Sequence, residues 1–311
     1  NRAISAAYPP GSTFKPSTAM AVMASGKVSP DFSLTCNSST WVPPMATCPR
    51  AHGHVDLVRA MAVSCNAYFQ VTAAQVGIET LYPLYQKLGY GQLTGIELPS
   101  EVKGLLASPE WKAENFPEDD WEHEWRLYDT YYMSMGQGFT NNTPIQMASA
   151  IAAIANDGER MQVHLVDKIL DYQNNEIYQM EPTVVSKIEA DQSAYDIVQE
   201  AMRAVCQSGG AAYSLFGNYP IEVAAKTGTA QTGLQGDDPD ADYHGWFVAF
   251  APYDDPEVAF AGVIEYGYHG GTSAGRVCKA VFDEYFGLNE DNEEDEENIQ
   301  VDMGIITGTI E

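Results

Sequence analysis

The separation of helices from strands along the chain is the feature that most constrains its fold. β-branched and aromatic segments are concentrated late, at Ile221–Gln231, Tyr243–Ala251 and Val258–Tyr266. The last two are joined by Pro252-Tyr253-Asp254-Asp255-Pro256, whose turn residues predict a β-hairpin. Because helices and antiparallel strands are segregated instead of alternating, we expect an α+β fold and not a parallel doubly wound sheet.

Capping residues mark the expected helices. Thr143-Pro144-Ile145-Gln146 combines an N-cap, a proline at the first helical position and a capping-box glutamine, and Asn156-Asp157-Gly158 is a C-terminal stop. Further helices are predicted after Pro9-Pro10-Gly11, over a stretch that places Val198, Met202 and Val205 on one face and ends at Gly209-Gly210, and from Ser273 to Phe286.

The charge of the chain excludes two classes of partner. Its 311 residues contain 16 Lys and Arg against 43 Asp and Glu, which gives a net charge of −27. Such a surface repels nucleic acid and anionic membranes, while 45% hydrophobic residues are enough to build a packed core. The acidic patches at Glu118–Asp129 and Asp237–Asp242 are interpreted as solvated faces, and the run Glu290–Glu297 as a solvated tail.

Membrane and targeting signals are not visible in the sequence. No stretch approaches the roughly 18–20 consecutive apolar residues that a spanning helix needs. The sequence begins Asn1-Arg2-Ala3-Ile4 without an initiator methionine, so it is interpreted as a mature or excised fragment.

The five cysteines contain no C-x-x-C pair, which argues against a zinc ribbon or a thioredoxin-type redox site. Cys36 and Cys48 bracket a polar, proline-containing loop. Two interpretations stay open for them, a disulfide that closes the loop in an oxidising compartment or two unpaired thiols. Cys206 and Cys278 occupy apolar helical positions and are expected in the core.

Neither a metal nor a cofactor is expected. His52-Gly53-His54 resembles a metal pair, but without a third ligand it is interpreted as structural. Ser134–Gly138 contains a G-x-G without the third glycine or the preceding strand of a phosphate-binding loop.

A candidate nucleophile lies where the first long helix begins. In Ser12-Thr13-Phe14-Lys15 the hydroxyl and the amine are three residues apart and share a helix face. A desolvated lysine can remove the proton that makes serine a poor nucleophile, and a helix N-terminus can stabilise an oxyanion. The same S-x-x-K spacing at Ser100–Lys103 lies in a probable loop and is interpreted as accidental.

Two further motifs follow in order. Ser64-Cys65-Asn66 supplies a second hydroxyl and a carboxamide. Lys226-Thr227-Gly228, followed by Thr229, lies on a predicted strand, where the cation and hydroxyls can hold a substrate carboxylate and Gly228 permits close approach to the backbone. Together with S-x-x-K, they match the signature of serine–lysine acyltransferases.

Longer segments extend this match. The chain resembles the transpeptidase domain of class B penicillin-binding proteins over about residues 1–286, and the segments that carry the resemblance are Asn1–Pro16, His52–Phe69, Ser134–Ala148, Ala225–Gln231 and His244–Pro252. The resemblance implies a β-lactamase/transpeptidase-like α+β fold, with an antiparallel sheet flanked by helices and a helix-rich lobe that forms the cleft. It also implies a catalytic domain over 1–288 that lacks its first strands, and an acidic tail over 289–311.

The resemblance implies a role for each residue of the first two motifs. Ser12 is the expected nucleophile toward the penultimate D-Ala carbonyl of a peptidoglycan stem peptide, and Lys15 its general base. Ser64 is expected to pass the proton to the leaving amine. Asn66 is expected to hold the substrate amide and to position Lys15.

The third motif is implied to bind the end of the substrate. Lys226, Thr227 and Thr229 are expected to hold the terminal carboxylate, which a β-lactam imitates. The backbone N–H groups of Ser12 and Thr229 form the expected oxyanion hole.

The expected partners are therefore stem peptides ending in D-Ala-D-Ala and β-lactam antibiotics. The resemblance further implies a membrane-anchored protein whose catalytic domain is extracytoplasmic and which works with a glycosyltransferase. Two alternatives stay open: a serine β-lactamase or D,D-carboxypeptidase, in which water takes the acyl group, and a non-catalytic penicillin sensor.

Overall fold

The computed structural model describes residues 1–38, 48–232 and 243–289. Its helices are α1 (Arg2–Ser5), the 3₁₀ turn η1 (Gly11–Phe14), α2 (Lys15–Ala24), α3 (Leu57–Ala62), α4 (Asn66–Val76), α5 (Ile78–Lys87), α6 (Pro109–Asn115), α7 (Leu127–Ser134), α8 (Pro144–Ala155), α9 (Gln192–Ala204), α10 (Tyr213–Phe216) and α11 (Ala274–Tyr285). Its strands are β1 (Leu34–Cys36), β2 (Gly53–Val55), β3 (Leu105–Leu106), β4 (Thr140–Asn141), β5 (Glu159–Met161), β6 (Lys168–Leu170), β7 (Glu176–Gln179), β8 (Val184–Lys187), β9 (Ala224–Gln231), β10 (Tyr243–Ala251) and β11 (Val258–Ile264).

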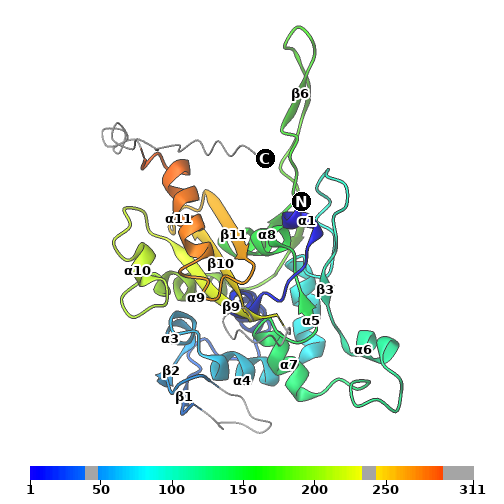
Figure 1. The fold of residues 1–311 in the computed structure, drawn as a ribbon, viewed down its shortest axis with the longest axis vertical. Coiled ribbons are helices and arrows are strands. Elements are labelled where there is room, and N and C mark those ends of the chain that lie inside the picture. Colours follow the sequence, from blue (N-terminus) through cyan, green and yellow to red (C-terminus); the bar gives the residue numbers. More distant parts are fainter. Residues whose placement is uncertain (39–47, 233–242, 290–311) are drawn as a thin grey trace, which may run out of the picture.

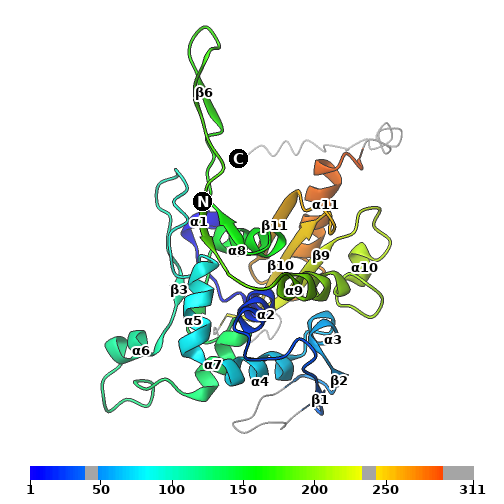
Figure 2. The same ribbon diagram turned by 180° about the vertical axis from the view of Figure 1, so that it is seen from behind.

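A three-stranded antiparallel sheet, in the order β11-β10-β9, forms the centre of one layer. Helix α11 covers one face, and α8 and α9 cover the other (Figures 1 and 2). Because both faces are covered, His244–Ala251 of the middle strand are all buried. The expected α+β architecture and the β10–β11 hairpin are confirmed.

Helix α2 joins this layer to a helical lobe made largely of α3, α4, α5 and α7 (Figure 2). Every residue from Lys15 to Met23 is buried, since α2 packs against α4 and α5 on one side and against α8 and α9 on the other. This lobe meets β9 (Figure 1), and residues of both line the cleft described below.

The sequence locates two helices correctly. At α8, Thr143 Oγ1 accepts from the Gln146 N–H at 3.3 Å, and Gln146 Oε1 accepts from the Thr143 N–H at 3.0 Å, as the capping box predicts. Helix α11 lies within one residue of its expected bounds. Helix α9 ends at Ala204 and not at Gly209-Gly210, because the Val205 carbonyl accepts from the Ala212 N–H and turns the chain earlier.

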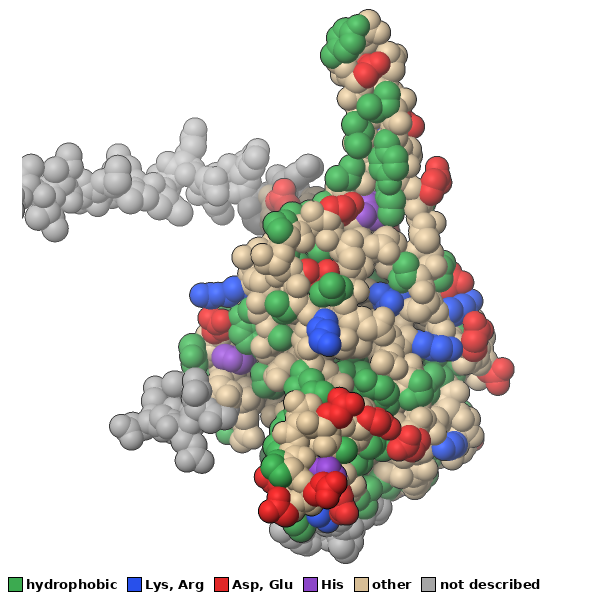
Figure 3. Space-filling model, turned by 90° about the vertical axis from the view of Figure 1, so that its right-hand side faces the viewer, with side chains coloured by type: hydrophobic (Ala, Val, Ile, Leu, Met, Phe, Trp, Pro, Cys, Tyr) green, Lys and Arg blue, Asp and Glu red, His purple; other side chains and the backbone are tan. Residues whose placement is uncertain are grey.

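A projecting hairpin, β6–β7, is a feature that the sequence did not indicate (Figures 1 and 3). All residues of both strands are exposed, and Tyr172 at the turn is 93% exposed. The side chain of Asp171 accepts from the N–H groups of Gln173 and Asn175 and closes the turn. With no buried face, these strands lack the alternation of apolar and polar residues that marks a strand in a sequence.

Two expectations concern the ends and the surroundings of the domain. The predicted tail beyond Asn289 and the undecided segment Met303–Ile310 lie outside the described residues. Among the helices of the described ranges, none combines the length and the apolar character needed to cross a bilayer.

Candidate active site

The segment with the predicted nucleophile is held in place by a glycine. Gly11 adopts φ +55°, and a Cβ atom there would lie 2.9 Å from the carbonyl oxygen of Thr229. The Gly11 N–H donates to the Gly136 carbonyl at 2.8 Å. Ser12 follows in η1, which packs against strand β9, and lines a cleft of about 750 Å³.

Lys15 is the first residue of α2 and is fully buried. Its Nζ donates to the Ser64 carbonyl at 2.9 Å, to Ser64 Oγ at 3.0 Å and to Asn66 Oδ1 at 2.7 Å. Burial lowers its pKa to about 8, opposed by the nearby thiols of Cys48 and Cys65. A lysine that is partly neutral near physiological pH can act as a base, as the sequence predicts for Lys15.

Ser64 and Asn66 lie on the tight turn between α3 and α4. Ser64 adopts φ +56°, a strained conformation for a residue with a side chain. Asn66 begins α4, and the Sγ of Cys48 accepts from the N–H groups of Asn66 at 3.0 Å and Ala67 at 3.4 Å. The turn thus directs both predicted side chains at Lys15.

The third motif lies on β9, on the opposite side of the cleft. Thr227, Gly228 and Thr229 line the cleft, and a Cβ atom at Gly228 would lie 2.8 Å from Cγ2 of Thr13. Lys226 is fully buried and is not one of the residues that line the cleft, and its Nζ donates to the Thr227 carbonyl at 2.9 Å. Burial, followed by the charge of Lys15, lowers the pKa of Lys226 well below its ordinary value.

The structure therefore brings the three motifs together. Ser12, Ser64, Asn66, Thr227, Gly228 and Thr229 line one cleft, and Lys15 is bonded to two of them. Among the described residues, Lys15 Nζ donates to Ser64 and Asn66 and not to Ser12. The second S-x-x-K copy, at Ser100–Lys103, lies in a loop and not in this cleft.

Sequence reasoning missed part of the lining. Tyr132 of α7, Gln231 at the end of β9 and His269 after β11 all contribute to the cleft. Tyr132 and His269 belong to no motif, so nothing in the sequence singled them out. Met135 and Gln137 also line it, in keeping with the interpretation of Ser134–Gly138 as a loop near the cleft.

A cluster of soft ligand atoms lies behind the Ser64–Asn66 turn. The side-chain donor atoms of Cys36, Cys48, His52 and Cys65 all lie within 4.8 Å of one another. Three sulfurs and one imidazole are a donor set that holds zinc in structural sites. Hydrogen bonding from the Cys65 thiol lowers the pKa of Cys48, which favours the thiolate that a metal requires.

This cluster corrects two expectations. Cys36 and Cys48 are free thiols, so the disulfide interpretation is wrong, and Cys48 Sγ instead lies 3.7 Å from Cys65 Sγ. His52 does have ligand-type neighbours, so the expectation that no metal site exists is not supported by the geometry. The four donors come from separate segments, which is why no C-x-x-C spacing revealed them. Cys206 and Cys278 are buried in the core, as predicted.

Comparison with known proteins places the chain in one family. The model of the "Penicillin binding protein transpeptidase domain" matches residues 1–283. The peptidoglycan D,D-transpeptidase MrdA of Acinetobacter baumannii is 35% identical over all of this chain and 47% of its own length, and MrdA of Escherichia coli is 29% identical over 91% of this chain and 46% of its own. The chain thus spans about half the length of these relatives.

Solved structures show the same family resemblance. Penicillin-binding protein PBP2 of Pseudomonas aeruginosa, in complex with WCK 5153, superposes with a TM-score of 0.79 at 30% identity, over 92% of this chain and 62% of that one. A structure titled "Structural coordination of polymerization and crosslinking by a peptidoglycan synthase complex" superposes with a TM-score of 0.80 at 29% identity, over 94% of this chain and 48% of that one.

Proposed function

This chain belongs to the penicillin-binding protein transpeptidase family, and from that premise we propose that it is a peptidoglycan D,D-transpeptidase that works through a Ser12 acyl-enzyme. One observation carries the proposal: a fully buried Lys15 donates to Ser64 Oγ at 3.0 Å and to Asn66 Oδ1 at 2.7 Å, next to Ser12 at the cleft. A buried lysine one helical turn from Ser12 is the kind of group that can serve as the base in serine acylation.

Acylation begins when Lys15, in its neutral form, takes the proton of Ser12. The Ser12 Oγ forms a bond to the penultimate D-Ala carbonyl carbon, and the backbone N–H groups of Ser12 and Thr229 stabilise the oxyanion. The peptide C–N bond then breaks. Ser64 passes a proton from Lys15 to the nitrogen of the departing D-Ala, since its hydroxyl is bonded to Nζ.

We assign binding of the substrate to strand β9. Thr227 and Thr229 face the cleft and can donate to the terminal carboxylate. We assign Lys226 of the same strand to the binding of this carboxylate too, although its buried amine here donates to the Thr227 carbonyl. An amine of a second stem peptide then takes the acyl group. A β-lactam, which carries a similar carboxylate, acylates Ser12 in place of the substrate.

We assign this activity to residues 1–288 and propose that the whole protein is membrane-anchored, with its catalytic part outside the cytoplasmic membrane. A glycosyltransferase is the proposed partner, supported by the similarity to a peptidoglycan synthase complex. The proposed function also has a place for a metal: a zinc ion held by Cys36, Cys48, His52 and Cys65 would brace the turn that carries Ser64 and Asn66.

The decisive experiment is acylation by a fluorescent penicillin, followed by intact-mass spectrometry. We expect one stable adduct on the chain and none on Ser12→Ala. An adduct that survives this substitution, or no adduct at all, would contradict the proposal. Rapid release of free enzyme would favour a β-lactamase or carboxypeptidase. Stable acylation without transfer to any amine acceptor would favour a penicillin sensor.

A further inference from the structure

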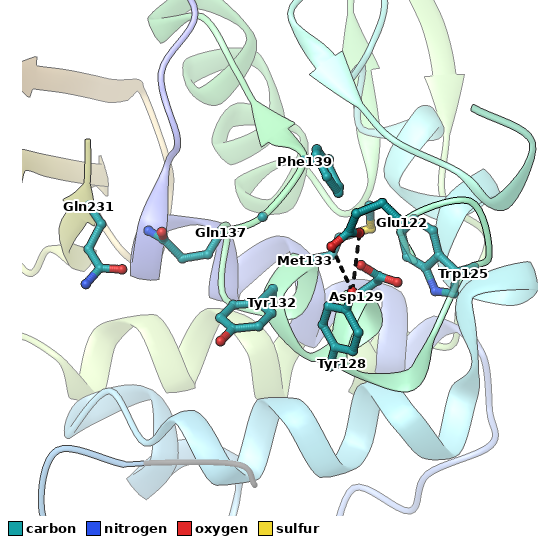
Figure 4. A pocket seen from close by; sticks show the side chains of 10 residues that line it. Glu122, Trp125, Tyr128, Asp129, Tyr132, Met133, Gln137, Phe139 and Gln231 are labelled. Atoms are coloured by element: carbon teal, nitrogen blue, oxygen red, sulfur yellow. Dashed lines mark hydrogen bonds between the residues drawn. The ribbon is translucent and has the colours of Figure 1, made fainter. Parts of the chain in front are cut away.

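Two groups of side chains near the cleft take no part in the proposed reaction. The first lines a pocket of about 280 Å³, where Glu122 accepts from the Tyr128 hydroxyl (Figure 4). Glu122 and Asp129 are also paired with the buried Lys112, so these polar groups are already satisfied within the protein. The second is the cluster of three cysteines and one histidine described above, in which two thiols are in contact.

Cys48 and Cys65 are the two thiols in contact. Their Sγ atoms are 3.7 Å apart, and both are free thiols. Cys36 is the third thiol of the cluster, and its Sγ lies 3.9 Å from the Arg50 carbonyl oxygen and 3.7 Å from His52 Nδ1. We therefore assign Cys65 as the partner of Cys48 in any reaction that joins two of these sulfurs.

The Cys48 sulfur also supports the turn that carries Ser64 and Asn66. It accepts from the Asn66 N–H at 3.0 Å, at the N-terminus of α4, where the backbone N–H groups have no partner within the helix. Cys65 lies between Ser64 and Asn66 in the sequence, and Lys15 Nζ donates to the side-chain oxygens of both neighbours. A change at this pair of sulfurs therefore acts directly on the residues that hold the predicted base.

We propose that Cys48 and Cys65 form an oxidation site, at which a small peroxide converts the two thiols into a disulfide that slows the acylation of Ser12. The effect on acylation rests on the proposed transpeptidase function, whereas formation of the disulfide does not. The proposed location outside the cytoplasmic membrane places these thiols in an oxidising compartment. The reaction requires the metal-free chain, because a zinc ion in the cluster would hold both sulfurs.

The oxidation has two steps and consumes one hydrogen peroxide. The Cys48 sulfur, which is 5% exposed while Cys65 is 0% exposed, attacks one peroxide oxygen. The O–O bond breaks, one water leaves, and Cys48 becomes a sulfenic acid. The Cys65 sulfur then attacks the Cys48 sulfur, so that an S–S bond forms, the S–O bond breaks and a second water leaves. The two thiol protons end in the two waters, and two electrons pass from the thiols to the peroxide.

The disulfide disturbs the turn because the two sulfurs must approach each other. They are 3.7 Å apart, and a covalent S–S distance is about 2 Å. The Cys65 N–H donates to the Ala60 carbonyl at 2.8 Å, which anchors that residue, so we expect Cys48 to move more. Its movement weakens the hydrogen bond to the Asn66 N–H and shifts Asn66 relative to Lys15. A misplacement of about 1 Å can cost on the order of a hundredfold in rate.

The test exposes the chelator-treated chain to hydrogen peroxide. Peptide mapping by mass spectrometry without reduction identifies the linked cysteines. The rate of acylation by a fluorescent penicillin is measured before oxidation, after it, and after treatment with dithiothreitol. We expect one Cys48–Cys65 linkage, a fall in the rate of about tenfold or more, and recovery on reduction. The recovery separates a disulfide from irreversible oxidation of cysteine and from oxidation of methionine.

Three variants locate the effect. Cys206→Ala removes a buried thiol outside the cluster and is the matched control, so we expect it to respond to peroxide as the wild type does. Cys36→Ala should still form the linkage and lose rate relative to its own reduced form, whereas Cys65→Ala should form no linked pair. Because the wild-type chain is oxidised and reduced without any substitution, the test holds even where a variant fails to fold.

The outcomes that contradict the inference are distinct. No linkage in the wild-type chain, or a linkage that involves Cys36, would overturn the assigned oxidation site. A Cys48–Cys65 linkage with an unchanged acylation rate would overturn its effect on acylation. Failure of the reduced wild-type chain to react with penicillin would instead refute the proposed function, and the mapped linkage would still decide whether the disulfide forms.

Discussion

Lys15 in the floor of the cleft and Lys112 beneath α7 are equally buried, yet their surroundings give them opposite properties. Lys15 is bonded to a carbonyl, a hydroxyl and an amide oxygen, which are neutral, and burial lowers its pKa. Lys112 is bonded to two carboxylates, and although burial alone would lower its pKa, these bonds raise it. The charge of the partners, more than the depth of burial, decides whether a buried lysine serves as a base or as a permanent cation.

The largest expected effect comes from removing the base. Lys15→Met leaves Ser12 without a proton acceptor, so we expect the rate of acylation by penicillin to fall by about a thousandfold. Stopped-flow or gel-based measurement of the adduct gives this rate. Lys112→Met serves as the contrasting variant and is expected to retain the wild-type rate in its folded fraction. A similar fall in both variants would contradict the proposed difference between Lys15 and Lys112.

For Lys112→Met we expect a large effect on stability, although we expect none on the rate of acylation. Lys112→Met leaves Glu122 and Asp129 close together without their cation, and we expect the free energy of unfolding to drop by about 3 kcal/mol. Urea denaturation followed by circular dichroism measures it. Lys187→Met is the matched control, because its pair with Glu159 is solvent-exposed and should matter little. Equal destabilisation by the two variants would argue against a special role for Lys112.

The pH dependence of acylation should report the protonation of Lys15. Only the neutral amine is a base, so below a pKa of about 8 the rate should rise about tenfold for each pH unit and then level off above it. The sign follows from the lowered pKa: an ordinary lysine would still be charged at pH 9. Lys112→Met should keep the same midpoint. A midpoint near 10 would contradict the assignment of Lys15 as a desolvated base.

The smallest effect is expected at the thiol that caps α4. Cys48→Ser weakens the acceptor for the Asn66 and Ala67 N–H groups, and we expect a loss of about 1 kcal/mol in the free energy of unfolding. If zinc braces this turn, a chelator should lower the Tm of the wild-type chain but not of this variant, and metal analysis should find one zinc per chain only in the former. If metal analysis finds no zinc and the chelator leaves the Tm unchanged, the proposed zinc site is refuted and Cys48 acts only as a helix cap.

Features encoded over a few residues could be predicted from the sequence. The capping box at Thr143, the β10–β11 hairpin and the three motifs depend on local chemistry or on a family resemblance. The structure contains the capping box and the hairpin where they were expected, and residues of the three motifs line one cleft. Features assembled from distant segments could not. The Cys36–Cys65 cluster draws on β1, a loop and the start of α4, and the ion pairs of Lys112 join α6 to α7.

Because α2 is buried, the position of the predicted base Lys15 depends on the stability of the whole molecule. Since Lys15–Met23 have no exposed residue and contact both layers, the lysine cannot leave its position by the fraying or local opening that surface segments undergo. The backbone amide protons of α2 should exchange only through global unfolding. An activity carried on such a helix should disappear on heating in the same transition as the fold, and not before it.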